Sequence, residues 1–425
     1  MNKNTNAFLH NFFHLSLLRI ISHILPLIST PFLLKAIGVK EFGVLELCKT
    51  TTMYFTAFVS YGFRYSAAKQ ITLHQQDKCR IGQIISSVYV IQVIFIAVSI
   101  LLMAILIICI PALQHHATFL INFFPIVITS GLFPTFIFQG MNIMKWLVGI
   151  NLVAKLLFLC SVLLFIHQPS DAILFPRFLA GIDVFRLLAS LVVVYKYQKI
   201  HCKCPRLAIM MQQLKEGVNI FLSILATMFY ARFPVTFLGF FVGPEAVGIY
   251  SLGEKITKAT EGMLEPAMQA LYPISHCKLQ KNLEQGLQYL WQFAKKGFVI
   301  LLGVGMLCAV FADPIMCILM GTDIPAAVQV FKIQAFVAAI MLLSNILGMH
   351  VLIPLKAGHL YTAAIVITGL VAAGLHRLLI PAFSTQGAAS AVLISELVLL
   401  LLLGFSARHT VKKARLEAPK EKAIE

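Results

Sequence analysis

Seven basic residues lie inside segments that are otherwise apolar enough to cross a membrane: Arg19, Lys155, Arg186, Arg232, Lys255, Lys258 and Lys332. A basic side chain at the centre of an inserted helix costs roughly 2.5 to 3.5 kcal/mol, so it persists mainly where it faces a wet cavity or a partner charge. These residues therefore predict an internal path for a negatively charged ligand.

Acidic residues share one of these segments with two of the basic ones. Glu254, Lys258, Glu261 and Glu265 recur at spacings of four, three and four residues, which places them on one face of a helix. One interpretation is an ion-paired stripe that packs the helix against its neighbours. The other is that Glu254 or Glu261 exchanges H+ or Na+ during transport, while Lys255 and Lys258 attract an anion.

Some of the other charged residues within apolar segments have a polar or charged residue on the same helical face, and one has none. Asp183 and Arg186 are three residues apart and Asn151 and Lys155 four apart, so each pair shares a helical face. We favour a self-satisfied Asp183–Arg186 pair, with ion coupling by Asp183 as the alternative. Lys332 is alone in its segment and requires water or a partner on another helix.

The composition of the chain indicates a membrane protein. Of its 425 residues, 59% are hydrophobic and 12% are charged, which exceeds what a soluble core requires. At about 20 residues per crossing, we expect an all-α integral membrane protein with about twelve transmembrane helices. Their predicted ranges are 8–34, 44–63, 82–110, 119–138, 146–166, 174–195, 216–241, 247–271, 292–312, 327–349, 359–380 and 387–407.

The distribution of basic residues sets the predicted orientation. With twelve crossings and a cytoplasmic N-terminus, most of the 34 Lys and Arg residues fall in cytoplasmic segments, as the positive-inside rule requires. The charged range 247–271 is counted as a helix because omitting it would place the basic C-terminal tail outside. We assign the net charge of +17 to topology and to contact with anionic membrane lipids, not to nucleic acid.

The even number of helices predicts two halves that both begin in the cytoplasm, which is the arrangement of parallel repeats. We expect a six-helix bundle over residues 1–205, a second over 206–407, and a basic cytoplasmic tail over 408–425. A short internal match supports the repeat. Gly38-Val-Lys-Glu-Phe-Gly43 in the first half resembles Gly243-Pro-Glu-Ala-Val-Gly248 in the second.

Several short motifs, in order along the chain, resemble those of the polysaccharide flippases. These are the O-antigen transporters of the multidrug/oligosaccharidyl-lipid/polysaccharide exporter superfamily. The motifs are Leu25-Pro26, Phe42-Gly43, Tyr61-Gly62-Phe63, Phe138-Gln139-Gly140, Leu214-Lys215-Glu216-Gly217, Val247-Gly248-Ile249-Tyr250, Glu254-Lys255-Ile256 and Gln269-Ala270-Leu271-Tyr272-Pro273.

The resemblance implies two helix bundles around a central cavity, alternating access, and a bacterial inner-membrane location. It further implies transport of an undecaprenyl-diphosphate-linked oligosaccharide from the cytoplasmic to the periplasmic leaflet. A diphosphate needs cationic partners in a medium of low dielectric constant, and the planar fork of Arg suits phosphate better than Lys. The predicted substrate-binding residues are therefore Arg19, Arg186 and Arg232 first, then Arg64, Lys155, Lys255, Lys258 and Lys332.

Each of these arginines has an alternative role, which is to reach the membrane interface or to pair with a neighbouring helix. A cation or drug antiporter of the same superfamily is the second functional hypothesis, and it would require an acidic cavity. A membrane-embedded glycan polymerase or ligase is the third, but the predicted external loops are short, so we do not expect an enzyme. We expect no metal site and no cofactor beyond coupling to H+ or Na+. Other polysaccharide-assembly membrane proteins are further candidate partners.

Overall fold

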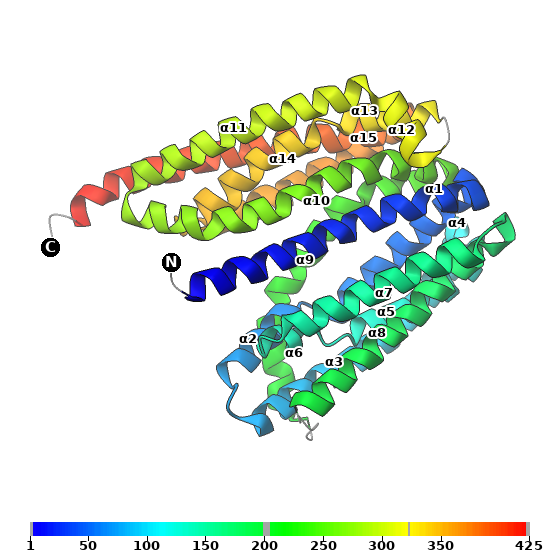
Figure 1. Cartoon of the computed structure of the whole chain (residues 1–425), viewed down its shortest axis with the longest axis horizontal. Coiled ribbons are helices and arrows are strands. Elements are labelled where there is room, and N and C mark those ends of the chain that lie inside the picture. The colour runs from blue at the N-terminus through cyan, green and yellow to red at the C-terminus, as the bar shows by residue number, and fades with distance from the viewer. Residues whose placement is uncertain (1–2, 199–204, 322–323, 422–425) are drawn as a thin grey trace. The chain divides into compact units, whose positions relative to one another are not determined.

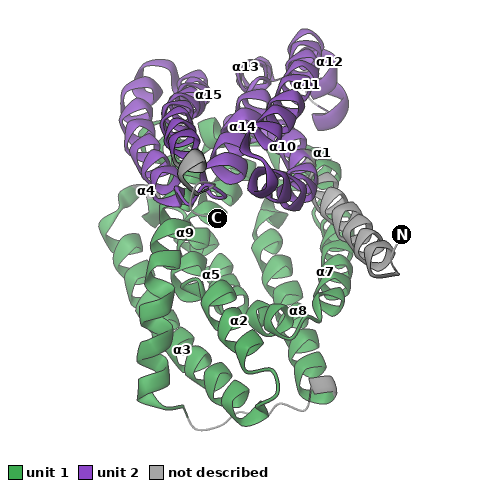
Figure 2. Ribbon diagram, turned by 90° about the vertical axis from the view of Figure 1, so that its left-hand side faces the viewer, with its two compact units in different colours: residues 1–248 green, residues 249–425 purple. Residues whose placement is uncertain are grey.

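The computed structural model describes residues 3–198, 205–321 and 324–421, and all regular elements within these ranges are helices (Figure 1). Side chains are described for residues 27–111, 113–196, 205–262, 264–321 and 324–416. The chain divides into two compact units, residues 1–248 and 249–425 (Figure 2).

The first unit contains α1 Lys3–Ser60, α2 Phe63–Leu73, α3 Lys78–Cys109, α4 Pro111–Gln114, α5 Ala117–Gly131, α6 Thr135–Gly140, α7 Met144–Phe165, the short helix η1 Pro169–Ile173, α8 Leu174–Gln198 and α9 Leu207–Phe241. The second unit contains most of α10 Pro244–Lys281, then α11 Leu283–Val310, α12 Ala312–Met320, α13 Pro325–Gln334, α14 Val337–Asn345, the π-helix η2 Ile346–Leu352 and α15 Gly358–Glu421.

The twelve predicted ranges fall largely on these helices, which confirms an all-helical fold. Within the described residues, eight segments are long and apolar enough to cross a membrane: 78–109, 117–140, 144–165, 169–196, 207–241, 283–310, 325–352 and 358–416. A count of twelve crossings stays a prediction. The segment in α10 carries five charged residues, Glu254, Lys255, Lys258, Glu261 and Glu265, so composition alone does not identify it as a crossing.

Two of the long helices are each two helices joined at a break. The 64 residues of α15 would span about 96 Å as one straight helix, far more than the roughly 30 Å of a bilayer core. Its break lies at Ser384, with φ 51° and ψ −125°. The break in α1 lies at Gly38, with φ 78° and ψ 170°, a conformation that favours glycine. Both breaks fall between helices that were predicted to be separate.

Small residues allow helices of the first unit to pack closely, as is common where helices associate in membranes. A Cβ atom on Gly131 of α5 would lie 2.4 Å from Val59 of α1, and one on Gly140 of α6 would lie 2.7 Å from Ile71 of α2. Large apolar side chains, such as the fully buried Phe138, complete this core.

The two glycines that end the internal sequence match lie against each other's segments. A Cβ on Gly43 would lie 1.8 Å from the carbonyl oxygen of Pro244 and 2.7 Å from the backbone nitrogen of Gly248. A Cβ on Gly248 would lie 2.3 Å from the carbonyl oxygen of Val39. The backbones of α1 and the start of α10 therefore approach as closely as glycine permits.

The compact units do not divide the chain at residue 205, where we place the boundary between repeats. Helix α9 packs against α1, α2 and α3, so the first unit extends to residue 248. Gln70 of α2 donates two hydrogen bonds to the Glu216 carboxylate of α9, at 2.9 and 2.8 Å. A repeat and a packing unit need not coincide, so the repeat boundary stays a prediction.

The second unit is built around α14, which packs against α11 and α15 (Figure 1). Its apolar core includes Leu290 of α11, Leu342 of α14 and Leu403 of α15. Helix α14 continues into η2, where His350 is buried and its Nδ1 lies 3.1 Å from the Ser275 hydroxyl of α10. Single turns of π-helix often occur at functional sites.

Candidate functional site

The first candidate site is a pocket of about 660 Å³ in the first unit, with α9 as its main wall. The lining residues of α9 recur in pairs every four positions and therefore share one helical face. Met53 of α1 and Tyr65 of α2 complete the wall. The lining comprises Met53, Tyr65, Asn219, Ile220, Ser223, Ile224, Thr227, Met228, Ala231 and Arg232.

Arg232 is the charged residue in the lining of this pocket. It is half-buried, and no carboxylate within the described part of the chain forms an ion pair with it. The helix around it is fixed by Tyr54, whose hydroxyl lies 2.9 Å from that of Thr236 and whose ring stacks on Phe229 at 4.8 Å. The predicted cation Arg232 is therefore available to an anion that enters the pocket.

Arg64 lies next to the same pocket. Its side chain is exposed, and its guanidinium carbon lies 5.7 Å from the ring centroid of Tyr65, which lines the pocket. A cation held over an aromatic face is weakly stabilised there. Two of the predicted cations, Arg64 and Arg232, are thus brought to one region, which their spacing of 168 residues along the sequence could not show.

A separate charge cluster in the first unit joins α5, α7 and α8. Nη1 of Arg186 lies 3.1 Å from Oδ1 of Asp183, which is the pairing that their spacing predicts. The Ser130 hydroxyl donates to Oδ2 of Asp183 at 3.1 Å, and the Arg186 guanidinium lies 4.5 Å from the ring centroid of Phe133. Lys155 is exposed but close enough to Arg186 for the two positive charges to interact.

With two cations and one carboxylate, this cluster carries a formal charge of +1. Asp183 is largely buried, whereas the Arg186 side chain is 25% exposed. Nε of Arg186 is buried without a hydrogen-bond partner among the described residues. The carboxylate therefore neutralises one of the two predicted cations, and the roles assigned to Lys155, Asp183 and Arg186 stay predictions.

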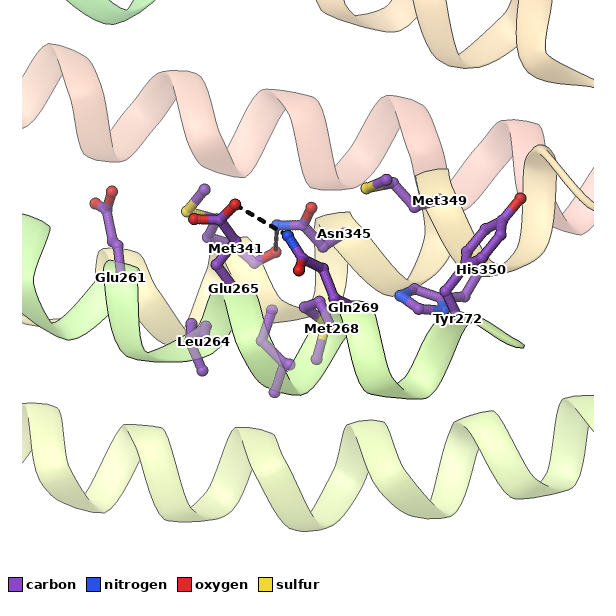
Figure 3. Close-up of a pocket in the computed structure, with 11 residues that line it drawn as sticks. Glu261, Leu264, Glu265, Met268, Gln269, Tyr272, Met341, Asn345, Met349 and His350 are labelled. Atoms are coloured by element: carbon purple, nitrogen blue, oxygen red, sulfur yellow. Dashed lines mark hydrogen bonds between the residues drawn. The ribbon is translucent and has the colours of Figure 1, made fainter. Parts of the chain in front are cut away.

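The second candidate site is a pocket of about 400 Å³ in the second unit, between α10 and the helix formed by α14 and η2 (Figure 3). Figure 3 shows Glu265, Gln269 and Asn345 close together in the middle of this pocket. Nε2 of Gln269 donates to Glu265 at 3.1 Å, and Nδ2 of Asn345 donates to the Met341 carbonyl at 2.9 Å. The lining comprises Glu261, Leu264, Glu265, Met268, Gln269, Tyr272, Met341, Leu342, Asn345, Met349 and His350.

The charged stripe of α10 is divided between different surroundings. Nζ of Lys258 lies 2.7 Å from Oε2 of Glu261, so this pair has the geometry of the ion-paired interpretation. Lys258 is exposed and Glu261 lines the pocket. Glu254 is buried and Lys255 is half-buried. Their substrate-binding and ion-coupling roles stay predictions.

One further predicted cation, Lys332, lines neither pocket. Lys332 of α13 pairs with Asp313 of α12, with 2.8 Å between Nζ and Oδ2. Asp313 is exposed and Lys332 is half-buried. Asp313 is therefore the partner that Lys332 was expected to need. The side chain of Arg19 lies outside the described residues.

Residues without charge form much of both pockets and were not predicted. Asn219, Ser223 and Thr227 follow one another at intervals of four residues along α9, and Gln269 and Asn345 line the second pocket. The signal for the first three was their regular spacing within an apolar helix. Among the described residues, no group of three His, Cys, Asp or Glu side chains could hold a metal ion.

Comparison with known proteins identifies the family. A family model described as polysaccharide biosynthesis protein matches residues 8–276. The putative O-antigen transporter of Escherichia coli (strain K12) is 26% identical over 410 residues, covering 95% of this chain and 98% of the relative. The putative O-antigen transporter of Shigella dysenteriae is 25% identical over 342 residues, covering 78% and 83%.

Solved structures share the fold at low sequence identity. An inward-facing multidrug resistance MATE family transporter of the MOP superfamily has a TM-score of 0.78 at 12% identity, covering 94% of this chain and 99% of that structure. The Lipid II flippase MurJ, in an inward closed conformation, has a TM-score of 0.70 at 13% identity, covering 95% and 90%. The expectation of a multi-pass membrane transporter, and not an enzyme, is confirmed. The chain belongs to the polysaccharide biosynthesis protein family.

Proposed function

We propose that this protein is a flippase for a polyprenyl-diphosphate-linked oligosaccharide, such as an O-antigen repeat unit. It would move this lipid from the cytoplasmic to the periplasmic leaflet of a bacterial inner membrane. Two six-helix bundles would provide alternating access to a central cavity, with both chain termini in the cytoplasm. The names of the curated relatives and the flippase fold of MurJ support this proposal.

The observation that carries the proposal is the position of Arg232 in the pocket of the first unit. The α9 wall of this pocket presents one guanidinium beside a row of amide and hydroxyl side chains. A guanidinium binds phosphate through paired, charge-assisted hydrogen bonds. The Ser223 and Thr227 hydroxyls donate to backbone carbonyls one turn earlier, so their oxygens remain able to accept hydrogen bonds from sugar hydroxyls.

The head group of the substrate would be the part that passes through the protein. An unpaired diphosphate is very costly in an apolar medium, whereas the polyprenyl chain can stay in the lipid. Arg232 and Arg64 would offset the charge of the diphosphate. We propose that H+ or Na+ coupling uses Asp183, Glu254 or Glu261, of which Glu261 lines a pocket.

A flipping assay with purified protein in liposomes tests the proposal. A labelled undecaprenyl-diphosphate oligosaccharide is incorporated, and its exposure on the opposite leaflet is followed with time. A hydrogen bond to a charged group contributes about 1.5–3 kcal/mol, so Arg232→Gln is expected to slow flipping roughly 10- to 150-fold. Arg206→Gln is the matched control because Arg206 is exposed and caps the same helix away from the pocket.

A cation antiporter is the second candidate function. The pocket of the second unit carries two carboxylates, Glu261 and Glu265, and a multidrug transporter shares the fold. This alternative predicts uptake of an organic cation by the same liposomes when a H+ or Na+ gradient is imposed. Cation uptake that is lost in Glu265→Gln, together with no flipping by the parent protein, would replace our proposal with the antiporter.

A further inference from the structure

A third cavity, of about 760 Å³, lies in the second unit between α11, the helix formed by α14 and η2, and the C-terminal half of α15. Most of its wall is apolar, and examples are Leu290, Trp291, Leu347 and Leu400. None of the charged residues discussed above lines it. This cavity, which we name the α11/α15 groove, therefore needs a separate explanation.

Residues on one face of α15 line the groove, which is apolar near Leu400 and basic near Arg415. Leu400, Gly404, Arg408, Lys412 and Arg415 line the groove at spacings of four, four, four and three residues, so they share a helical face. At 1.5 Å per residue, about 12 Å separates Leu400 from Arg408, and about 10 Å separates Arg408 from Arg415. One leaflet of a bilayer core is about 15 Å thick, so the apolar part has nearly the depth of a leaflet.

The basic end of the groove holds two cations without a carboxylate partner among the described residues. Arg415 is occupied, because its Nε and Nη2 donate to the two oxygens of Glu284 at 2.7 and 3.1 Å. This bidentate pair fixes α15 to the first turn of α11. Arg408 and Lys412 are exposed and form no such ion pair with a described residue.

We propose that the α11/α15 groove binds an anionic glycerophospholipid, with its acyl chains along the apolar wall and its phosphate between Arg408 and Lys412. Charge complementarity selects an anionic headgroup, because a zwitterionic lipid adds a positive charge beside two cations. Trp291 lines the groove and is 69% exposed, as is common for aromatic residues near a membrane interface. The bound lipid would hold α11 and α15 together beside the Arg415–Glu284 pair.

Native mass spectrometry of the purified full chain tests this site. The protein is delipidated and titrated with dioleoylphosphatidylglycerol or with dioleoylphosphatidylcholine, which have the same acyl chains. Each basic residue near an anionic lipid surface contributes about fivefold in affinity. Arg408→Gln/Lys412→Gln is therefore expected to weaken phosphatidylglycerol binding about 30-fold and to leave phosphatidylcholine binding unchanged. Lys78→Gln/Arg80→Gln removes the same charge from the first turn of α3, where Lys78 is exposed and Arg80 half-buried, and should retain the preference.

Gly404→Trp tests the apolar part of the groove independently. A Cβ on Gly404 would meet no atom within 4 Å, and Gly404 lines a groove of about 760 Å³, so a tryptophan at this position is expected to direct its indole into the groove. Loss of both lipids in Gly404→Trp, with parental thermal stability, supports the site. Three results would overturn it: an unchanged phosphatidylglycerol preference in the double variant, tighter binding of a polyprenyl phosphate than of phosphatidylglycerol, or a dimer of the chain that Gly404→Trp dissociates.

Discussion

Replacing Gly43 by alanine tests the close backbone contact between α1 and the start of α10. The added Cβ would lie 1.8 Å from the carbonyl oxygen of Pro244, whereas ordinary contacts begin at 3.4 Å. The two backbones would therefore have to separate by about 1.6 Å, the difference between these distances. The obstructing atoms belong to the backbone, so no side chain can turn away. Overpacking costs about 1–3 kcal/mol, and we expect the upper end of this range.

The contact bears on transport because Gly43 and Gly248 occupy equivalent places in the internal sequence match. If two repeats move against each other in alternating access, a contact between equivalent hairpins must form in one state and break in the other. Gly43→Ala should then shift the population towards the state in which the contact is open. A shift of 1–3 kcal/mol corresponds to roughly 5- to 150-fold in the equilibrium constant.

Thiol accessibility measures this shift. Val247 is fully buried beside the contact, and Val247→Cys can be followed by its reaction with a membrane-impermeant maleimide, identified by peptide mass spectrometry. We expect faster labelling and slower flipping in Gly43→Ala. Gly149→Ala in α7 is the control, since its Cβ would meet no atom within 4 Å, and a helical Gly-to-Ala change stabilises by about 0.5–1 kcal/mol. Parental labelling and parental stability in Gly43→Ala would refute the reasoning.

Two further predictions concern the ion pairs. Asp183→Leu leaves the Arg186 guanidinium without its carboxylate and should lower the free energy of unfolding by about 3 kcal/mol, while Asp183→Leu/Arg186→Leu should recover most of this loss; equal thermal stability of the single variant and the parent would contradict the pairing. The hydrogen bond from Lys332 holds the pKa of Asp313 below its usual value of 3.8, so the stability it adds is present above pH 3.8 and is lost as pH falls through the lowered pKa. In Lys332→Gln the ionised Asp313 should no longer add stability, so the unfolding midpoint should fall less between pH 5 and pH 2.5 than in the parent. The same pH dependence in variant and parent would argue against a stabilising Lys332–Asp313 pair.

The helices could be predicted from the sequence because each crossing must satisfy its backbone polar groups internally and present apolar side chains to lipid. The crossing within α10 was predicted from the distribution of basic residues instead, because its five charged residues lower its mean hydropathy. The extent of the first compact unit, residues 1–248, was not predictable from the sequence. The contact of α9 with α1, α2 and α3 depends on the distances between helices far apart in the sequence, and local patterns carry no such information.

The candidate site was predictable where charge was involved and not elsewhere. An Arg within an apolar helix is costly enough to be noticed, and Arg232 does line a pocket. An uncharged amide side chain such as Asn219 or Gln269 costs much less free energy within an apolar helix than an Arg does. Such residues occur in many helices, so composition does not single them out. The partner of Lys332 is 19 residues away on another helix, beyond the reach of the three- and four-residue spacings used to find pairs.

The cations within the helices differ in what they can offer to a phosphate. Arg186, Lys258 and Lys332 each have a carboxylate within 3.1 Å, so a phosphate would have to compete with that carboxylate and leave it unpaired. No described carboxylate forms an ion pair with Arg232, so a phosphate would displace none there. Because Arg232 lines a pocket, a phosphate could gain the full charge-assisted interaction. The number of buried cations is therefore a poor measure of an anion path. If Arg232 binds the diphosphate, Arg232→Glu should slow flipping far more than Lys332→Glu, although both substitutions change the net charge equally.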